Sequence, residues 1–161
     1  MDRECFRCDI LSELFNIGVG RAAAMLSEIV HRKISLQIPK IKIPEKENGE
    51  LKLSEQFSDL FDGALMVSTI SFTNSLKGRA NLVFPAEKIK KFVTLCSGDA
   101  SVPPEDTVFT DVDFDVIREI GNILLNCILG ELGNLINIQL TYDLPHVAVY
   151  DRIDFSKDID S

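Results

Sequence analysis

The sequence predicts an α+β fold with an internal pseudo-twofold repeat, on the strength of three observations. Two long segments carry apolar residues three and four positions apart, as one face of a helix does. Shorter segments alternate apolar and polar residues, which is typical of half-buried strands. A pattern of acidic residues, asparagine and proline occurs twice at one fixed offset. We therefore expect a mostly antiparallel sheet with the two long helices packed side by side on one of its faces.

Composition limits the classes of protein to consider. The chain has 161 residues, of which 45% are hydrophobic and 26% are charged. This length and composition predict one compact domain and exclude a disordered chain. A total of 17 Lys and Arg against 25 Asp and Glu gives a net charge of −8, and no basic run interrupts the acidic excess. Nucleic acid and anionic membrane surfaces are therefore poor candidate partners.

The sequence also predicts a soluble, cytoplasmic protein. Its first residues, MDRECFRC, are charged where a signal peptide would be apolar. The most apolar long stretch, Asn122 to Ile138, contains Glu131 and several asparagines and does not suit a membrane span. The 4 cysteines are too few for a disulfide scaffold, which favours a reducing compartment.

The first predicted element is a helix from about Arg3 to Val30, with Asp2 as its N-cap. Its apolar face comprises Ile10, Leu14, Ile17, Met25, Leu26 and Ile29. The helix also contains two pairs of small residues four positions apart, Gly18 with Ala22 and Gly20 with Ala24. Such pairs let a neighbouring backbone approach closely, so we expect packing there rather than a hinge.

The segment after this helix alternates apolar and polar residues. It predicts a half-buried strand over Lys33 to Pro44 that bends at Pro39. Glu45 to Glu50 is expected to be a solvated loop. Leu51 to Asp62 is ambiguous and suits a short amphipathic helix.

The middle of the chain predicts a hairpin and a helix. The strands are Ala64 to Phe72 and Gly78 to Phe84, joined by a short polar connection. Pro85 suits the start of a helix, which Ser97-Gly98 ends. Ala100 to Asp106 is expected to be a linker.

The second long helix is predicted from Thr110, its N-cap, through Leu132. Three acidic residues would lie near its positive end, namely Asp111, Asp113 and Asp115. The remaining strands are predicted from Leu135 to Tyr142 and from His146 to Phe155, separated by Pro145. The polar tail SKDIDS is expected to fray.

The repeat relates the two long helices at an offset of 106 residues, the distance from Asp9 to Asp115. The matched residues are, in order, Asp9, Glu13, Asn16 and Pro39 with Asp115, Glu119, Asn122 and Pro145. Four such identities at one offset have a chance probability of about 10⁻⁵. We therefore predict a single domain, 1–161, built of two related halves at about 1–100 and 107–161. Counterparts of the hairpin would lie beyond Ser161, so a sheet edge needs cover, either from the rest of a longer chain or from a second copy in a homodimer.

Each copy of the pattern places Asp, Glu and Asn at positions i, i+4 and i+7, within roughly 60° of one another around a helix. Two acids one turn apart repel slightly, so the helix itself gains nothing from them, whereas a cation on a partner would. The Asn carboxamide carries one acceptor and two donors in a plane, which suits it to orienting a water molecule. Phosphoryl transfer depends mainly on positioning and charge neutralisation, and an amide that orients the attacking water recurs in it. The Glu could pair with a Lys of the partner and fix the Asn in register.

The two copies are Asp9-x3-Glu13-x2-Asn16-x22-Pro39 and Asp115-x3-Glu119-x2-Asn122-x22-Pro145. They resemble the twin motif of the CheC/CheX/FliY family of chemotaxis phosphatases, and CheC most. The segments NIGVGRAAAMLS and GRANLVFPAEKIKKFVTL also resemble CheC, so that the similarity covers nearly the whole chain. CheX is similar in the second motif only.

The resemblance implies an enzyme that hydrolyses the aspartyl phosphate of a CheY-type response regulator. It implies that Asn16 and Asn122 orient the hydrolytic water. It also implies that Glu13 and Glu119 contact a Lys of the regulator. The Mg²⁺ of the reaction would belong to the regulator, so no metal or cofactor of the chain's own is expected.

Other interpretations stay open. Asp9 and Asp115 are expected to help at the helix starts, in a supporting role only. The alternative function is a non-catalytic binding or adaptor module of the chemotaxis or flagellar switch apparatus, because CheC-like proteins also bind the deamidase CheD. The presence of both Glu and Asn pairs argues against pure scaffolding. A small-ligand sensor is a third class, for which the sequence has no pocket motif.

Overall fold

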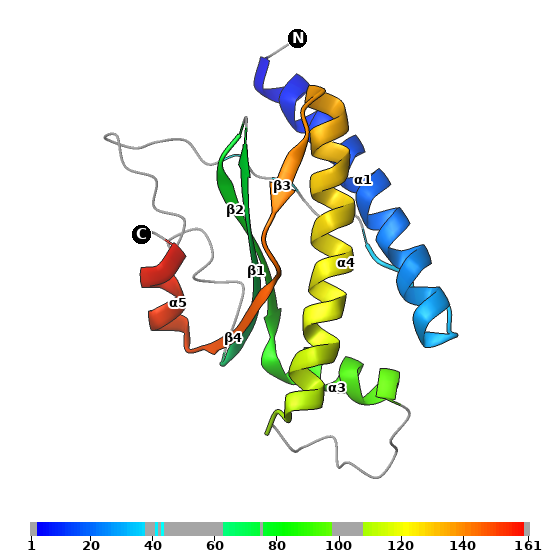
Figure 1. Cartoon of the computed structure of the whole chain (residues 1–161), viewed down its shortest axis with the longest axis vertical. Coiled ribbons are helices and arrows are strands. Elements are labelled where there is room, and N and C mark those ends of the chain that lie inside the picture. Colours follow the sequence, from blue (N-terminus) through cyan, green and yellow to red (C-terminus); the bar gives the residue numbers. More distant parts are fainter. Residues whose placement is uncertain are drawn as a thin grey trace. The chain divides into compact units, whose positions relative to one another are not determined.

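Figure 1 shows the computed structural model, which describes residues 3–37, 41, 43, 63–74, 76–97 and 108–159. The helices of this part are α1 (Arg3–Val30), α3 (Ala86–Ser97), α4 (Asp111–Ile136) and α5 (Arg152–Ile159). The strands are β1 (Leu65–Asn74), β2 (Gly78–Pro85), β3 (Leu140–Tyr142) and β4 (His146–Tyr150). β1 lies between β2 and β3 and also pairs with β4. The pairings with β3 and β4 are antiparallel, which confirms a mixed α and β fold with an antiparallel sheet.

The chain divides into two compact units, each assembled from three separate segments. The unit called here the helix-pair unit comprises residues 1–43, 70–80 and 119–145. The unit called the hairpin unit comprises residues 44–69, 81–118 and 146–161. Each unit therefore takes residues from early and late parts of the sequence.

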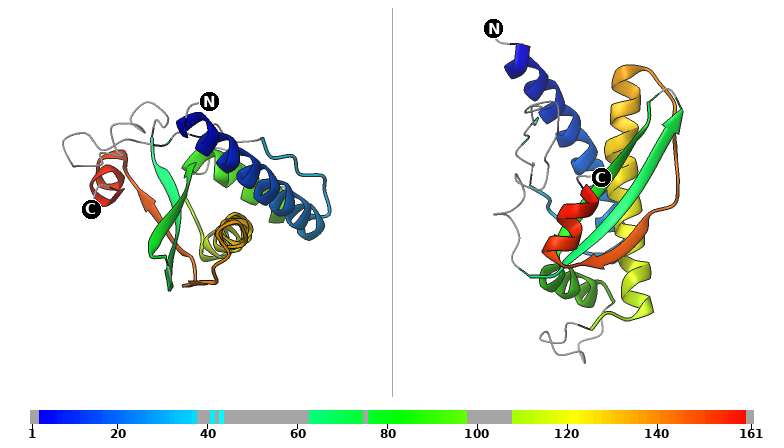
Figure 2. Two further views of the ribbon diagram at one scale, coloured as in Figure 1. Left: turned by 90° about the horizontal axis from the view of Figure 1, so that it is seen from above. Right: turned by 90° about the vertical axis from the view of Figure 1, so that its left-hand side faces the viewer.

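In the helix-pair unit, α1 and the C-terminal part of α4 run in opposite chain directions (Figures 1 and 2). Gly18 is buried, and a Cβ built on it would lie 3.0 Å from Cα of Ile128. Ala22, one turn later, has no exposed surface. The close backbone approach expected at this pair of small residues is therefore present. The second pair, Gly20 and Ala24, is exposed instead.

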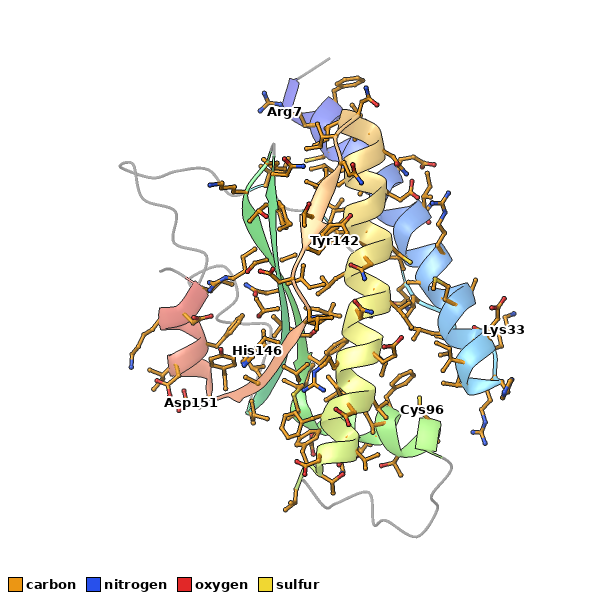
Figure 3. The ribbon with its side chains drawn as sticks, viewed as in Figure 1. Arg7, Lys33, Cys96, Tyr142, His146 and Asp151 are labelled. Atoms are coloured by element: carbon orange, nitrogen blue, oxygen red, sulfur yellow. The ribbon has the colours of Figure 1, made fainter. Side chains whose placement is uncertain are left out.

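The helix-pair unit also holds the end of the sheet. Phe72 pairs with Tyr142 and Asn74 with Leu140, in antiparallel register. Figure 3 labels Tyr142 on β3. Phe72 and Leu140 are buried, whereas Thr73 and Thr141, which pair with each other, are exposed. This alternation is that of a strand covered on one face only.

In the hairpin unit both faces of β1 are covered, because helices pack on each side. Met66 joins a buried cluster with α3 and α4 through Ile89, Val93 and Ile117. Leu65 and Val67, on the opposite face, pack against Phe155 of α5. Burial is consequently continuous from Leu65 to Ser68. Each of these apolar side chains contributes about 1.5–3 kcal/mol to folding through its burial.

The predicted strand from Lys33 to Pro44 is wrong over its described residues. Residues 33–37, 41 and 43 have no strand hydrogen bonding. The amide of Ile34 instead donates to Oγ of Ser27 at 2.9 Å, so the helix that precedes the segment takes the bond a sheet neighbour would need. Pro39 lies outside the described residues, as do the segments expected at 45–50, 51–62 and 100–106 and the cap expected at Asp2.

The end of α4 lies later than predicted. Leu135 and Ile136 are helical, and the strand expected from Leu135 is limited to Leu140–Tyr142. Asn137 has a left-handed φ of 54°. The amide of Ile138 donates to the carbonyl of Gly133 at 3.0 Å, and that of Asn137 to the carbonyl of Asn134 at 3.3 Å. These two bonds form a Schellman motif, which satisfies the last carbonyls and ends the helix at that point.

The C-terminal segment is also a correction. The predicted strand from His146 ends at Tyr150, and Ser156 to Ile159 of the predicted fraying tail are helical as part of α5. Asp151, labelled in Figure 3 at the start of α5, is the N-cap, because its Oδ1 accepts from the amide of Asp154 at 2.8 Å. Phe155 then turns into the core with 3% exposure. Within the described residues, no helix has both the length and the apolar character to cross a membrane.

Candidate functional site

The first Glu and Asn pair lies on the solvent side of α1. Glu13 and Asn16 are both exposed, while Leu14 between them is 5% exposed and belongs to the core. A helix rotates by about 100° per residue, so burying Leu14 leaves the two polar side chains outward. Both side chains therefore project from a helix whose other face is anchored.

The second pair, on α4, has the same spacing but a different environment. Glu119 is exposed, whereas Asn122 is half-buried. Ile120 and Ile123, next to them in sequence, are each 5% exposed. The carboxamide Oδ1 of Asn122 accepts a hydrogen bond from Nδ2 of Asn126 at 2.7 Å. The second Asn is thus held by a neighbour one helical turn away.

The two pairs form two separate places rather than one combined site. Glu13 lines a groove between α1 and α4 together with Glu131, Asn134 and Leu135. Glu119 precedes Asn134 by 15 residues of α4, and at 1.5 Å per residue this separation is about 22 Å along the helix. The two pairs are therefore too far apart to form one site.

A second groove between α1 and α4 contains the polar contacts of this helix pair. It has a volume of about 460 Å³ and is lined by Arg21, Ala24, Met25, Asn126, Cys127, Gly130, Glu131 and Asn134. Arg21 forms an ion pair with Glu131 across it. Sγ of Cys127 lies 3.7 Å from Sδ of Met25. Burial raises the pKa of the Cys127 thiol, although Arg21 opposes this, which favours the protonated thiol at neutral pH.

The two aspartates of the doubled motif are exposed, each one turn before its Glu. The carboxylate of Asp115 accepts from Arg118 at 2.5 Å. Asp115 lies in the hairpin unit and Asp9 in the helix-pair unit, which holds both Glu and Asn pairs. The described residues contain no group of three His, Cys, Asp or Glu side chains placed to hold a metal ion.

Asn126 is the site neighbour that the sequence argument missed. It lies one turn after Asn122, a spacing at which side chains on a helix meet. The offset of 106 residues places it opposite Gly20, which carries no side chain. The difference between Asn126 and Gly20 was the sequence signal that could have identified this residue. A comparison of the two halves that counts only identical residues does not detect it.

The fold and these residues define a class: a mixed α and β protein with Glu and Asn one turn apart on two helices. Two comparisons with known proteins support the CheC/CheX/FliY family. The chain is 28% identical over 144 residues to CheY-P phosphatase CheC of Bacillus subtilis (strain 168). The alignment covers 88% of this chain and 65% of that protein, so the chain spans less than two thirds of the length of this relative.

The second comparison concerns the fold. The crystal structure of Thermotoga maritima FliY matches with a TM-score of 0.74 and 24% sequence identity. The match covers 96% of this chain and 72% of the FliY chain. No protein-family model matches the chain.

Proposed function

We propose that this protein is a phosphatase that hydrolyses the aspartyl phosphate of a CheY-type response regulator in chemotaxis. The observation that carries the proposal is the doubled pair, a Glu and an Asn one turn apart on each of two helices. The exposure of Glu13, Asn16 and Glu119 leaves them accessible to a partner protein. The name of the B. subtilis relative, a CheY-P phosphatase, supports the same activity.

In this mechanism, Asn16 or Asn122 hydrogen-bonds a water molecule and directs it at the phosphorus atom. The water oxygen forms the new bond to phosphorus, the bond to the aspartyl oxygen breaks, and inorganic phosphate leaves. Such a reaction needs orientation more than proton abstraction. Glu13 or Glu119 pairs with a Lys of the regulator and sets the position of the Asn. In this proposal the Mg²⁺ of the reaction would be held by the regulator.

We also propose that α1 and α4 are the equivalent helices of two related halves. Two contacts between the helices support this: Arg21 contacts Glu131, and Met25 contacts Cys127. The offset of 106 residues relates Arg21 to Cys127 and Met25 to Glu131, so it converts one contact into the other. The helix ends agree as well. His31 follows α1 with a φ of 51° and Asn137 follows α4 with a φ of 54°.

The activity is tested with purified CheY that carries phosphate on its aspartate. The protein should accelerate the loss of that phosphate. The double variant Asn16→Ala/Asn122→Ala should lose the acceleration by on the order of a hundredfold, because the water is no longer oriented. Each single variant should keep the contribution of the other site.

The matched control is Gln139→Ala, which removes an exposed carboxamide that belongs to neither pair and lines neither of the two grooves. It should keep full activity. The proposal is wrong if the wild-type protein does not accelerate phosphate loss, or if the double variant is as active as the wild type.

The second candidate function is an adaptor that binds CheD without catalysis. The adaptor role, a homodimer and a cytoplasmic location all remain predictions. A pull-down in which the chain retains CheD and ignores phosphorylated CheY would favour the adaptor. Retention of phosphorylated CheY, weakened by Glu13→Gln and Glu119→Gln, would favour the phosphatase.

A further inference from the structure

The second Asn differs from the first in having an amide donor fixed beside it. Nδ2 of Asn126 donates to Oδ1 of Asn122 at 2.7 Å. Both residues are on α4 and both are half-buried. An amide at this separation on a helix is a favourable partner for another amide. The bond fixes the plane of the Asn122 carboxamide.

The carboxamide oxygen of Asn126 is a second notable feature of this residue. Its Oδ1 is buried and accepts no hydrogen bond from the described residues. An acceptor buried without a partner is unfavourable, and such groups in folded proteins call for an explanation. Asn126 lines the groove between α1 and α4, next to Cys127 and Met25. The protein thus keeps a poorly satisfied amide at a position from which it reaches Asn122.

The first copy lacks this arrangement. The residue one turn after Asn16 is Gly20, which has no side chain to donate. A Cβ built on Gly20 would meet no atom within 4 Å, so space for a longer side chain exists. Asn16 is exposed, whereas Asn122 is half-buried. No amide one turn later along α1 therefore fixes the carboxamide of Asn16 as Asn126 fixes that of Asn122.

We infer that Asn126 is a positioning residue that orients Asn122, so that the two sites work unequally. This inference rests on the proposed phosphatase function. The bond from Asn126 leaves one lone pair of the Asn122 oxygen and both of its N–H groups for water. A carboxamide that is already ordered loses less conformational freedom when the water is aligned for attack. The second site gains this advantage in the transition state. The effect of Asn126 should therefore appear in kcat rather than in KM.

The experiment isolates each site by removing the other Asn. In an Asn16→Ala background, where only the second site works, Asn126→Ala should lower kcat about two- to tenfold with KM nearly unchanged. Asn126→Asp, which keeps the shape but has no N–H to donate, should lower kcat at least as much. Gln139→Ala in the same background is the control, because this exposed carboxamide lines neither groove, and it should leave kcat as it was.

The reciprocal variant supplies the missing amide to the first site. In an Asn122→Ala background, Gly20→Asn should raise kcat by a similar factor, because the new amide reaches Asn16 from the same spacing. This gain does not depend on the stability of the Asn126 variants. A merely structural role of Asn126 would not predict it.

A readout without catalysis keeps this inference separate from the proposed function. The side-chain amide signals of Asn122 in ¹⁵N-resolved NMR should shift and sharpen toward a free carboxamide when Asn126 is replaced by Ala. An unchanged Asn122 signal, together with unchanged kcat, would overturn the positioning role. If the wild-type protein shows no phosphatase activity, the phosphatase proposal fails, and the amide signals still decide whether Asn126 holds Asn122.

Discussion

Asp113, which is 9% exposed, accepts three hydrogen bonds on one carboxylate oxygen. The donors are Nζ of Lys90 at 2.5 Å, the amide of Thr110 at 2.7 Å and the hydroxyl of Thr110 at 2.9 Å. The Thr110 hydroxyl accepts in return from the amide of Asp113 at 3.2 Å. This reciprocal pair is a capping box, so Thr110 is the N-cap that the sequence predicts. Lys90 also lies 5.4 Å from the ring centre of Phe109.

Asp113 makes the stability of the protein depend on pH. Burial raises the pKa of its carboxyl, but the hydrogen bonds from Lys90 and Thr110 outweigh burial and leave the pKa below its ordinary value. The ionised carboxylate therefore stabilises the folded protein fully above its unfolded pKa, and this contribution is lost as the pH falls through the folded pKa. Urea unfolding between neutral pH and about pH 3 should show the loss, and Asp113→Asn should make it shallower.

Replacing Asp113 by Ala should cost about 3–5 kcal/mol of unfolding free energy at neutral pH, because it leaves Lys90 buried without a counter-charge. Asp111→Ala in the same first turn is the matched control. Asp111 is exposed, so its loss should cost only about 0.3–1 kcal/mol through the helix dipole. Equal effects of the two substitutions would contradict this account.

At the scale of elements, the contact between α1 and α4 depends on Gly18. A Cβ there would lie 3.0 Å from Cα and 3.2 Å from Cγ1 of Ile128, and 3.3 Å from the carbonyl oxygen of Cys127. Two of these three atoms are backbone, which cannot rotate away. The helices can approach this closely only while position 18 has no side chain.

Gly18→Ala and Gly20→Ala therefore form a matched pair for thermal or urea unfolding. Both gain about 1 kcal/mol of helix propensity. Gly20→Ala should keep the gain, because a Cβ there meets no atom within 4 Å. Gly18→Ala should be less stable than Gly20→Ala by about 1–3 kcal/mol, the usual penalty of overpacking. Equal stability of the two variants would show that the helices are not in close contact.

At the scale of the whole molecule, the net charge of −8 makes contact with a cationic group of a partner sensitive to salt. If Glu13 and Glu119 each meet a Lys of the regulator, screening should weaken the encounter. Raising NaCl from about 0.05 to about 0.5 M should lower kcat/KM several-fold. The variant Glu13→Gln/Glu119→Gln should show a flatter salt dependence, measured by phosphate release from phosphorylated CheY. An equal slope in both proteins would place the charged contact elsewhere.

Local rules predicted much of this structure. Apolar spacing located α1, α3 and most of α4, and the alternating segments located β1 and β2. Lys33 to Gln37 alternates in the same way yet forms no strand. Alternation reports which side chains are covered, whereas a strand also needs a hydrogen-bonding neighbour that the local sequence does not specify.

The candidate site was likewise predicted only in part. The periodicity placed Asp, Glu and Asn on one stripe of each helix, and the structure has Glu13, Asn16 and Glu119 exposed. The half-burial of Asn122 and its bond to Asn126 were not predicted. Burial on one helix depends on which other elements pack against it, and a single helical pattern does not contain that information.

The sequence by itself determined α1, α3 and most of α4, the hairpin, the acidic charge and the doubled Glu and Asn pattern, because each follows from composition or from residues close together in the chain. Only the tertiary structure decided that α5 covers Leu65 and Val67 and that the two asparagines have different surroundings. These outcomes depend on contacts between residues far apart in sequence. The free energy of such contacts comes from burial and hydrogen bonding that exist only once the chain has folded.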